Sequence, residues 1–194
     1  MAEVASTFQL RTGAAAPAFA LADGSGGVHS PKSLVADHCG LLVAFVCNHC
    51  PFVVHLADAL GSFATEIDGQ GIATVAVSSN DIEKYPADAP DRMSEFAAAH
   101  GWRFPYLHDP DQSVAKAYAA ACTPDLYLFD GELRLAYAGQ FDDSRPGRGT
   151  PTGTDLRAAV ADLLAGRPTP EPWTPSSGCN IKWIPGNEPS YFFA

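Results

Sequence analysis

The sequence lacks any long hydrophobic run. No stretch of its 194 residues approaches the roughly 18 consecutive apolar residues of a membrane-spanning helix. The first residues, MAEVASTFQLRTG, also lack the basic start and long apolar core of a secretory signal. We therefore expect a cytoplasmic protein that has no membrane partner.

Positive charge is also scarce. Lys and Arg together number 12, against 22 Asp and Glu, so the formal net charge is −10. Nucleic acids and anionic membranes are bound by basic surfaces, so neither is an expected partner. Internal repeats and low-complexity segments are absent as well. A hydrophobic content of 46% is enough for one domain with a sizeable core.

Cysteine occurs in a small, odd number. There are five cysteines, and two of them form a CxxC motif, Cys47-Asn48-His49-Cys50. No second CxxC and no HxxxH accompanies it, so the four ligands of a structural zinc site are missing and we assign no metal ligands. In a cytosolic chain, a CxxC motif near a strand–helix–strand pattern favours redox chemistry over a structural disulfide framework.

The CxxC motif lies between a predicted strand and a predicted helix. Residues 41–46 are an uninterrupted apolar run, which is typical of a strand buried on both faces. Pro51 suits the first turn of a helix, where its missing N–H costs nothing. A helical stripe follows at steps of three and four residues: Phe52, Leu56, Leu60, Phe63 and Ile67.

This placement predicts a reactive thiol. A helix N-terminus offers free N–H groups and a partial positive charge, which lower the pKa of a cysteine there. We expect Cys47 to be the more exposed thiol and the nucleophile, and Cys50 to close a disulfide onto it. His49, if protonated, would favour the thiolate and make the disulfide more oxidising. With Asn48 and Pro51, which complete the turn, His49 is predicted to tune the redox properties of the pair.

The rest of the chain predicts further strands and helices. A strand over 72–77 completes a right-handed βαβ unit with the first strand, to which it should be parallel. Two later strands are joined by the turn Asp130-Gly131 and should form an antiparallel pair. The remaining elements are a small hairpin around 23–27, a helical turn capped by Ser30, a helix over 92–100 capped by Asp91, a strand over 104–107, a helix over 112–121, strands over 125–129 and 133–137, and a last helix capped by Thr154 and ended by Gly166.

The chain divides at residue 166. Residues 1–166 form the predicted domain, and residues 167–194 form a C-terminal tail. Six prolines are expected to break any regular element in the tail, while its aromatic residues make it too apolar for a disordered linker. We therefore expect the tail to lie packed on the domain, with Trp173 and Trp183 as anchors.

The order of the elements, with Cys122-Thr123-Pro124 after the CxxC motif, resembles the thioredoxin fold. This is an α/β fold with a central mixed β-sheet flanked by helices. The lead-in over 13–21 and the inserted helix before Phe104 resemble the longer peroxiredoxin branch, the AhpC/TSA group. The likeness is closer still to a peroxiredoxin-like group with a CNHCP motif. The segments that carry this likeness are 47–53, 122–125, 139–146 and 178–183. The resemblance implies a thioredoxin fold with an N-terminal hairpin extension and a C-terminal tail rich in proline and aromatic residues.

The resemblance also implies roles for residues outside the CxxC motif. Pro124 would be the cis-proline that faces the disulfide, and Thr123 would supply backbone groups that pair with an extended substrate. Cys122 would lie near the active site as an additional thiol. Cys179 would act as a resolving thiol if the tail folds over the pair. Without such a role, Cys122, Cys179 and Cys39 are packed cysteines with no chemical function.

The sequence departs from true peroxiredoxins at two positions. Their peroxidatic cysteine aligns with Cys50, but Cys47 stands where they have threonine and Val43 stands where they have proline. Since that arrangement orients a peroxide, its loss weakens the interpretation as a peroxidase. A cysteine of low pKa can still be oxidised to a sulfenic acid.

The predicted function is therefore that of a thiol–disulfide oxidoreductase. It would need no organic cofactor, because the electrons reside in the thiols. Its partners would be a disulfide-containing protein, or a small-molecule thiol or hydroperoxide, and a reductase or thiol electron donor. The enzymatic alternative is an antioxidant thiol peroxidase of the AhpC/TSA type. The non-enzymatic alternative is copper or zinc binding by the cysteine pair with His49, His55 or His108.

Two other groups of polar residues are expected to have structural rather than catalytic roles. Asp142, Asp143 and Arg145 are close in sequence within the loop before the last helix, and we expect a solvated loop with a local ion pair. His55 falls on the first long helix between apolar neighbours, where a histidine at the edge of the core or on the surface is expected.

Overall fold

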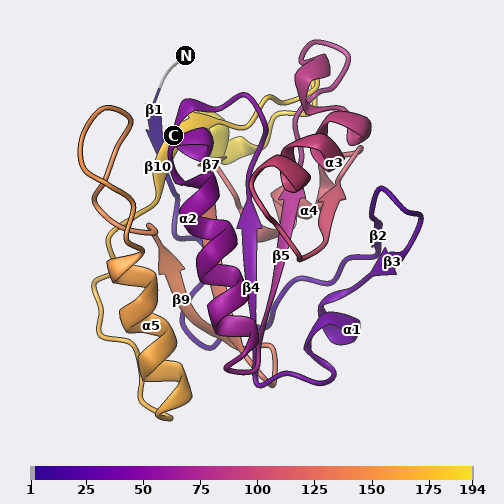
Figure 1. The fold of residues 1–194 in the computed structure, drawn as a ribbon. Coiled ribbons are helices and arrows are strands. Elements are labelled where there is room, and N and C mark those ends of the chain that lie inside the picture. The colour runs from indigo at the N-terminus through magenta and orange to yellow at the C-terminus, as the bar shows by residue number, and fades with distance from the viewer. Residues whose placement is uncertain (1–2, 194) are drawn as a thin grey trace.

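The computed structural model describes residues 3–193 and is built around a five-stranded sheet (Figure 1). The strand order is β6-β5-β4-β8-β9. Strands β4, β5 and β6 are parallel, whereas β8 runs antiparallel to β4 and β9 runs antiparallel to β8. The sheet is therefore mixed, as the resemblance implied. Its strands are β4 (Gly40–Phe45), β5 (Ile72–Ser78), β6 (Tyr106–His108), β8 (Asp125–Asp130) and β9 (Leu135–Gly139).

Strand β4 lies at the centre of this sheet. All residues of β4 and of β5 are buried, which confirms the predicted buried strands. The parallel pairing of β4 with β5 is also confirmed, in the register Gly40↔Ile72 to Phe45↔Val77. Because successive side chains of a strand point to opposite faces, Leu42 joins one hydrophobic core and Val43 joins the other.

Helices cover both faces of the sheet. Helices α2 (Pro51–Asp68), α3 (Pro90–Ala99) and α5 (Thr154–Leu164) supply side chains to the core that contains Leu42. Helices α1 (Pro31–Val35) and α4 (Ser113–Tyr118) pack against the opposite core. Figure 1 shows α2 running along the sheet beside β4. Because α2 begins directly after the cysteine pair, these two elements fix where the CxxC motif lies.

Three predicted helix boundaries are wrong. Helix α3 begins at Pro90 and its N-cap is Ala89, so Asp91 lies within the first turn instead of capping it. Helix α4 ends at Tyr118 because Ala119 adopts a left-handed conformation with φ 52°. Thr154 is the first residue of α5, and the N-cap is Gly153.

The N-terminal hairpin is confirmed. Strands β2 (Leu21–Ala22) and β3 (Val28–His29) pair antiparallel. The Asp23 carboxylate accepts hydrogen bonds from the backbone N–H groups of Ser25 and Gly27, which closes the turn between the strands. Ser30 caps α1, as predicted. This extension lies next to β6, since Asp23 forms a β-bridge with Leu107.

A second sheet involves both ends of the described chain. Strand β10 (Ser177–Asn180) pairs antiparallel with β1 (Glu3–Ala5) on one side and with β7 (Cys122–Thr123) on the other. The expectation that prolines break every regular element beyond residue 166 is therefore wrong. Prolines flank β10 but do not fall within it, so its backbone groups are free to pair. Two 3₁₀ turns complete the structure: η1 (Pro86–Asp88) and η2 (Ser190–Phe193).

The segment after β10 also contacts the domain. The side chains of Ile181 and Trp183 are buried in the core that contains Val43. The Lys182 backbone N–H donates to Asn80 Oδ1 at 2.8 Å. Within residues 3–193, no helix has both the length and the apolar content needed to cross a membrane.

Candidate active site

The CxxC motif occupies the turn between β4 and α2. Cys50 is the N-cap residue of α2, and Pro51 is the first residue of the helix. Both thiols are buried, with exposed fractions of 1% for Cys47 and 0% for Cys50. The expectation that Cys47 is distinctly more exposed is therefore wrong. The side chain of Asp88 contacts the turn through the Asn48 N–H, and strand β10 of the tail pairs with Thr123 beside it.

Thr123 is the residue on which the thiols converge. Cys47 Sγ lies 3.5 Å from Thr123 Oγ1, and the Cys50 thiol donates to the Thr123 carbonyl oxygen at 3.1 Å. The Thr123–Pro124 peptide bond is cis, as the resemblance implied. The backbone of Thr123 is paired with Cys179 of β10. In this state a substrate strand cannot pair with Thr123, so the predicted substrate contact requires β10 to withdraw.

Asp88 is the residue of the site that the sequence analysis missed. Its side chain is fully buried at the end of η1. Oδ1 accepts the Asn48 backbone N–H at 2.8 Å, and Oδ2 accepts Asn80 Nδ2 at 2.8 Å. His49 Nδ1 lies 2.7 Å from Oδ2. A loop aspartate far from the CxxC motif in sequence carries no pattern that would point to this position.

The pKa values of the two cysteines differ from the expectation that Cys47 is the reactive thiol. The hydrogen bond with Cys50, burial and the Asp88 carboxylate raise the pKa of Cys47. The hydrogen bond from Cys47, with further hydrogen bonds from Thr123 and Cys179, lowers the pKa of Cys50 to about 4. The mutual hydrogen bond of the pair therefore favours the thiolate on Cys50, at the start of α2, over Cys47, which also faces the Asp88 carboxylate.

His49 is held by two neighbours. Its ring stacks on Tyr85, with centroids 5.3 Å apart and an interplanar angle of 7°. Its Nδ1 faces Asp88, so a proton on His49 would be neutralised by that carboxylate. Lys182 Nζ lies 5.9 Å from the centre of the Tyr85 ring. A residue absent from the motif therefore opposes the effect that a positive charge on His49 would have on the thiolate, and the tuning role of His49 stays a prediction.

The three cysteines outside the CxxC motif have different surroundings. Cys179 is buried and contacts Cys50 through a hydrogen bond. Burial raises its pKa to about 12, with Cys50 as a further cause. Cys122 is also buried, but its thiol donates to the Pro124 carbonyl oxygen at 3.4 Å. Cys39 is exposed and lies 3.2 Å from the Gly71 carbonyl oxygen, before the start of β4.

Three side chains of the site are grouped as metal ligands would be. Cys47, His49 and Asp88 place their ligand atoms within 4.8 Å of one another. His55 is not part of this group, because its Nε2 contacts Ser144 Oγ at 3.1 Å. His108 ends β6, outside the group. Any metal bound here would involve Asp88 instead of the additional histidines that the sequence offered.

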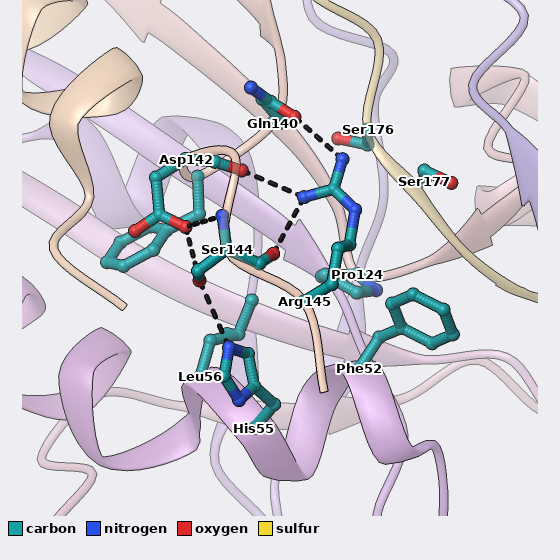
Figure 2. Close-up of a pocket in the computed structure, with 11 residues that line it drawn as sticks. Phe52, His55, Leu56, Pro124, Gln140, Asp142, Ser144, Arg145, Ser176 and Ser177 are labelled. Carbon is teal, nitrogen blue, oxygen red and sulfur yellow. Dashed lines mark hydrogen bonds between the residues drawn. The ribbon is translucent and has the colours of Figure 1, made fainter. Parts of the chain in front are cut away.

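A small cavity lies beside the first turn of α2 (Figure 2). Its volume is about 20 Å³, which is room for a single water molecule. Arg145 donates to the carbonyl oxygens of Asp142 and Ser144, and to Gln140 Oε1 at 2.9 Å. Asp142 is buried, and its carboxylate accepts the Gly153 N–H at 2.7 Å. The expected local ion pair is therefore wrong, since Arg145 binds carbonyl oxygens, whereas the exposed Asp143 and residues 146–150 agree with the expected solvated loop.

Asp125, directly after the cis-proline, allows a prediction about pH. It is fully buried, and its Oδ2 accepts hydrogen bonds from Tyr127 Oη at 3.1 Å and the Ala121 N–H at 3.2 Å. Burial raises the pKa of Asp125 to about 7. A raised carboxyl pKa in the folded state gives stability that is complete below the ordinary value and is lost as pH rises through 7.

Asp125→Asn should therefore remove part of the pH dependence of stability. Between pH 5 and pH 8, we expect the free energy of unfolding of the unmodified protein to fall by roughly 3 kcal/mol relative to that of the variant. Urea denaturation at several pH values measures this difference. Asp37→Asn, at an exposed position, is the control and should leave the profile unchanged. Parallel profiles for Asp125→Asn and the unmodified protein would contradict the prediction.

The sequence of the chain is similar to a known protein family. The sequence matches the AhpC/TSA family over residues 12–138. The chain belongs to the AhpC/TSA family. Its fold is that of the thioredoxin-like proteins, so the predicted fold class and the predicted resemblance to the AhpC/TSA group are confirmed, while the narrower group with a CNHCP motif stays a prediction. Among curated proteins, no match is found.

Several solved structures are similar to this chain over most of its length. A hypothetical protein from Sinorhizobium meliloti 1021 is 48% identical, with a TM-score of 0.90, over 94% of this chain and 99% of that chain. An uncharacterized conserved protein from Geobacillus kaustophilus is 47% identical, with a TM-score of 0.91, over 96% of this chain and 98% of that chain. Peroxidoxin BcpB from Mycobacterium tuberculosis is 18% identical, with a TM-score of 0.62, over 82% of this chain and 99% of that chain, and shares the fold. The family supports a thiol-based redox function, which requires a redox substrate and a reductant.

Proposed function

We propose that this AhpC/TSA protein is a thiol–disulfide oxidoreductase in which Cys50 is the nucleophile and Cys47 resolves the mixed disulfide. The observation that carries the proposal is the position of Cys50 at the start of α2, with Cys47 hydrogen-bonded to it and a lowered pKa of about 4. This order reverses the one expected from the sequence. A thiolate at the helix start is the reactive form of cysteine.

The proposed cycle moves two electrons. The Cys50 thiolate attacks one sulfur of a substrate disulfide, and the other substrate sulfur leaves as a thiolate and takes up a proton. Cys47 then loses its proton and attacks Cys50 Sγ, which releases the second substrate thiol and forms the Cys47–Cys50 disulfide. The reverse sequence oxidises a dithiol. No organic cofactor is required, and a reductase or a small thiol restores the pair.

The neighbouring residues have supporting roles in this proposal. Asn48 is fixed by its N–H bond to Asp88 and by Tyr106, whose hydroxyl donates to Asn48 Oδ1 at 3.0 Å. His49, held by the same carboxylate, accepts or supplies protons near Cys47. Thr123 and Pro124 would receive an extended substrate once β10 has withdrawn. Because both thiols are buried, small disulfides or thiols have an advantage over protein substrates in the closed state. We place this chemistry in the cytoplasm, as the sequence predicts.

Serine variants of the two cysteines test the proposal. With a small disulfide as substrate, Cys50→Ser should lose turnover by at least about a thousandfold, because the nucleophile is gone. Cys47→Ser combined with Cys179→Ser, which leaves no neighbouring thiol to attack the adduct, should also stop turning over but should accumulate a mixed disulfide on Cys50, which mass spectrometry detects. Cys39→Ser is the control and should turn over normally. A mixed disulfide on Cys47 in Cys50→Ser, with no reaction of Cys47→Ser, would restore the order expected from the sequence.

A thiol peroxidase is the second candidate, favoured by the low pKa of Cys50 and the burial of the site. A hydroperoxide is small enough to reach a covered thiolate. Cys50 would take up the terminal oxygen as a sulfenic acid, an alcohol would leave, and a second thiol would condense with the sulfenic acid and release water. Val43 and Cys47 still stand where peroxiredoxins have proline and threonine. Stoichiometric loss of hydroperoxide with sulfenic acid at Cys50 would support this candidate.

Metal binding is a third candidate because of the grouping of Cys47, His49 and Asp88. Zinc accepts a thiolate, an imidazole nitrogen and a carboxylate oxygen together. Binding would break the contact between His49 and Asp88 and would deprotonate Cys47. Zinc or copper that stays bound through dialysis, and that Asp88→Asn removes, would favour this candidate over the redox cycle.

A further inference from the structure

Three cysteines meet at one threonine in the core of this protein, two through their thiols and one through its backbone. Cys47 contacts Thr123 Oγ1 at 3.5 Å, and Cys50 contacts the Thr123 carbonyl oxygen at 3.1 Å. Cys179 is the pairing partner of Thr123 in the second sheet, and Thr123 Oγ1 donates to its carbonyl oxygen at 3.5 Å. All three belong to the same hydrophobic core. Cys179 therefore reaches the redox pair from a segment far away in sequence.

The position of Cys179 is held firmly. Strand β10 lies between β1 and β7, so both of its edges are paired. Gly178 lets it approach closely, since a Cβ at that position would lie 2.1 Å from the Thr123 carbonyl oxygen. The thiols of Cys47 and Cys179 both donate hydrogen bonds to the Cys50 sulfur, so Cys50 lies between the other two. A central sulfur with two thiol neighbours has two ways to form a disulfide.

We propose that Cys179 is a third redox-active cysteine and that Cys50 alternates between two disulfide partners, Cys47 and Cys179. This inference rests on the proposed function and extends it. The Cys50–Cys179 disulfide would attach β10 covalently to the start of α2. It would return Cys47 to the thiol state while the protein remains oxidised.

The exchange balances without an external reagent. Cys179 gives up its proton and attacks Cys50 Sγ in the Cys47–Cys50 disulfide. The bond between Cys47 and Cys50 breaks, and Cys47 leaves as a thiolate that takes up a proton. The number of disulfides stays the same, so no oxidant or reductant is consumed. Alternatively, Cys179 attacks Cys50 in a mixed disulfide with substrate and releases the substrate thiol.

A trapping experiment with dithiodipyridine tests this inference. The reagent is a small disulfide whose released thiopyridone is counted by absorbance. All variants carry Cys39→Ser, so that the exposed thiol does not react. Cys47→Ser keeps a hydroxyl group against Cys50 but removes the first partner. We expect it to release about two thiopyridones from the active site and to contain a Cys50–Cys179 disulfide by mass mapping.

Two matched variants serve as comparisons. Cys47→Ser with Cys179→Ser should release about one thiopyridone and keep the adduct on Cys50. Cys47→Ser with Cys122→Ser removes a buried thiol of the same sheet and should behave like Cys47→Ser alone. A lasting adduct on Cys50 in Cys47→Ser, or a Cys50–Cys122 disulfide, overturns the inference while the proposed function stands. Absence of any Cys47–Cys50 disulfide in the Cys39→Ser protein overturns the proposed function and this inference with it.

Discussion

Replacing Gly178 with alanine is expected to separate β10 from β7 and to open the thiol site. A Cβ at this position would lie 2.1 Å from the Thr123 carbonyl oxygen and 2.8 Å from its carbonyl carbon. Both are backbone atoms next to the cis-proline, so no flexible side chain can give way. The strand must move as a whole, and it carries Cys179 with it. Overpacking of this kind costs about 3 kcal/mol of unfolding free energy.

The Gly178→Ala effect is measured in two ways. Urea denaturation gives the loss of unfolding free energy. The rate at which Cys47 and Cys50 react with dithiodipyridine shows how far β10 shields the two thiols from the reagent. We expect the rate to rise at least about tenfold, because removal of β10 exposes both sulfurs. Gly69→Ala is the control, since Gly69 has φ −62° and a Cβ there meets only the Glu66 carbonyl oxygen at 3.4 Å. Unchanged reactivity in Gly178→Ala would show that β10 does not control access.

Asp88→Asn is expected to change both stability and thiol chemistry. The carboxylate accepts hydrogen bonds from Asn48 and Asn80 and faces His49. Asparagine can accept at one oxygen only, so its amide would meet the Asn80 amide as donor against donor. Leaving buried donors unpaired should cost roughly 2–4 kcal/mol at pH 7. The negative charge beside Cys47 also disappears, so the pKa of Cys47 should fall.

The pH dependence of the Asp88 effect has a defined sign. Burial opposes ionisation of Asp88, but hydrogen bonds from His49 and Asn80 outweigh it and lower its pKa. The stability that Asp88 supplies is therefore present above its ordinary pKa near 4 and is lost as pH falls through the lowered folded value. The unmodified protein and Asp88→Asn should differ most in unfolding free energy near neutral pH and converge in acid.

The two consequences of Asp88→Asn need separate measurements. Denaturant unfolding at several pH values gives the stability, and the pH dependence of Cys47 alkylation in a Cys50→Ala background gives the Cys47 pKa without the coupled thiol. Asp58→Asn is the matched control, because Asp58 also pairs with a histidine, His100, but is 87% exposed. Exposed pairs of this kind contribute little to stability. An unchanged Cys47 pKa in Asp88→Asn would show that the Asp88 carboxylate does not raise the pKa of Cys47.

The local half of the site was predictable from sequence. The apolar run before Cys47 can only be buried on both faces, and the stripe after Pro51 has the spacing of a helix. These patterns depend on neighbours in the chain. The same holds for the turn at Asp23 and the cap at Ser30, where side chains bond to backbone groups a few residues away.

The other half was not predictable because it depends on contacts between distant segments. Asp88 reaches the motif from a loop, and no periodic pattern marks a single buried carboxylate. After the hydrogen bond with Cys50 and burial, it is a further cause of the raised Cys47 pKa. Strand β10 is short and flanked by prolines, so local preference argues against it. It forms because β1 and β7 offer backbone partners on both sides, which only the folded chain reveals.

The pairing of β10 also has a consequence for biosynthesis. A ribosome adds about 5–20 residues per second, so Cys47 and Cys50 emerge roughly ten seconds before Ser177–Asn180. During that interval the nascent chain can form β4, α2 and β7, but the edge of β7 has no partner. The cysteines are then open to the reductants and oxidants of their surroundings. Oxidation or reduction of the pair can therefore take place before translation ends, when β10 has not yet been made.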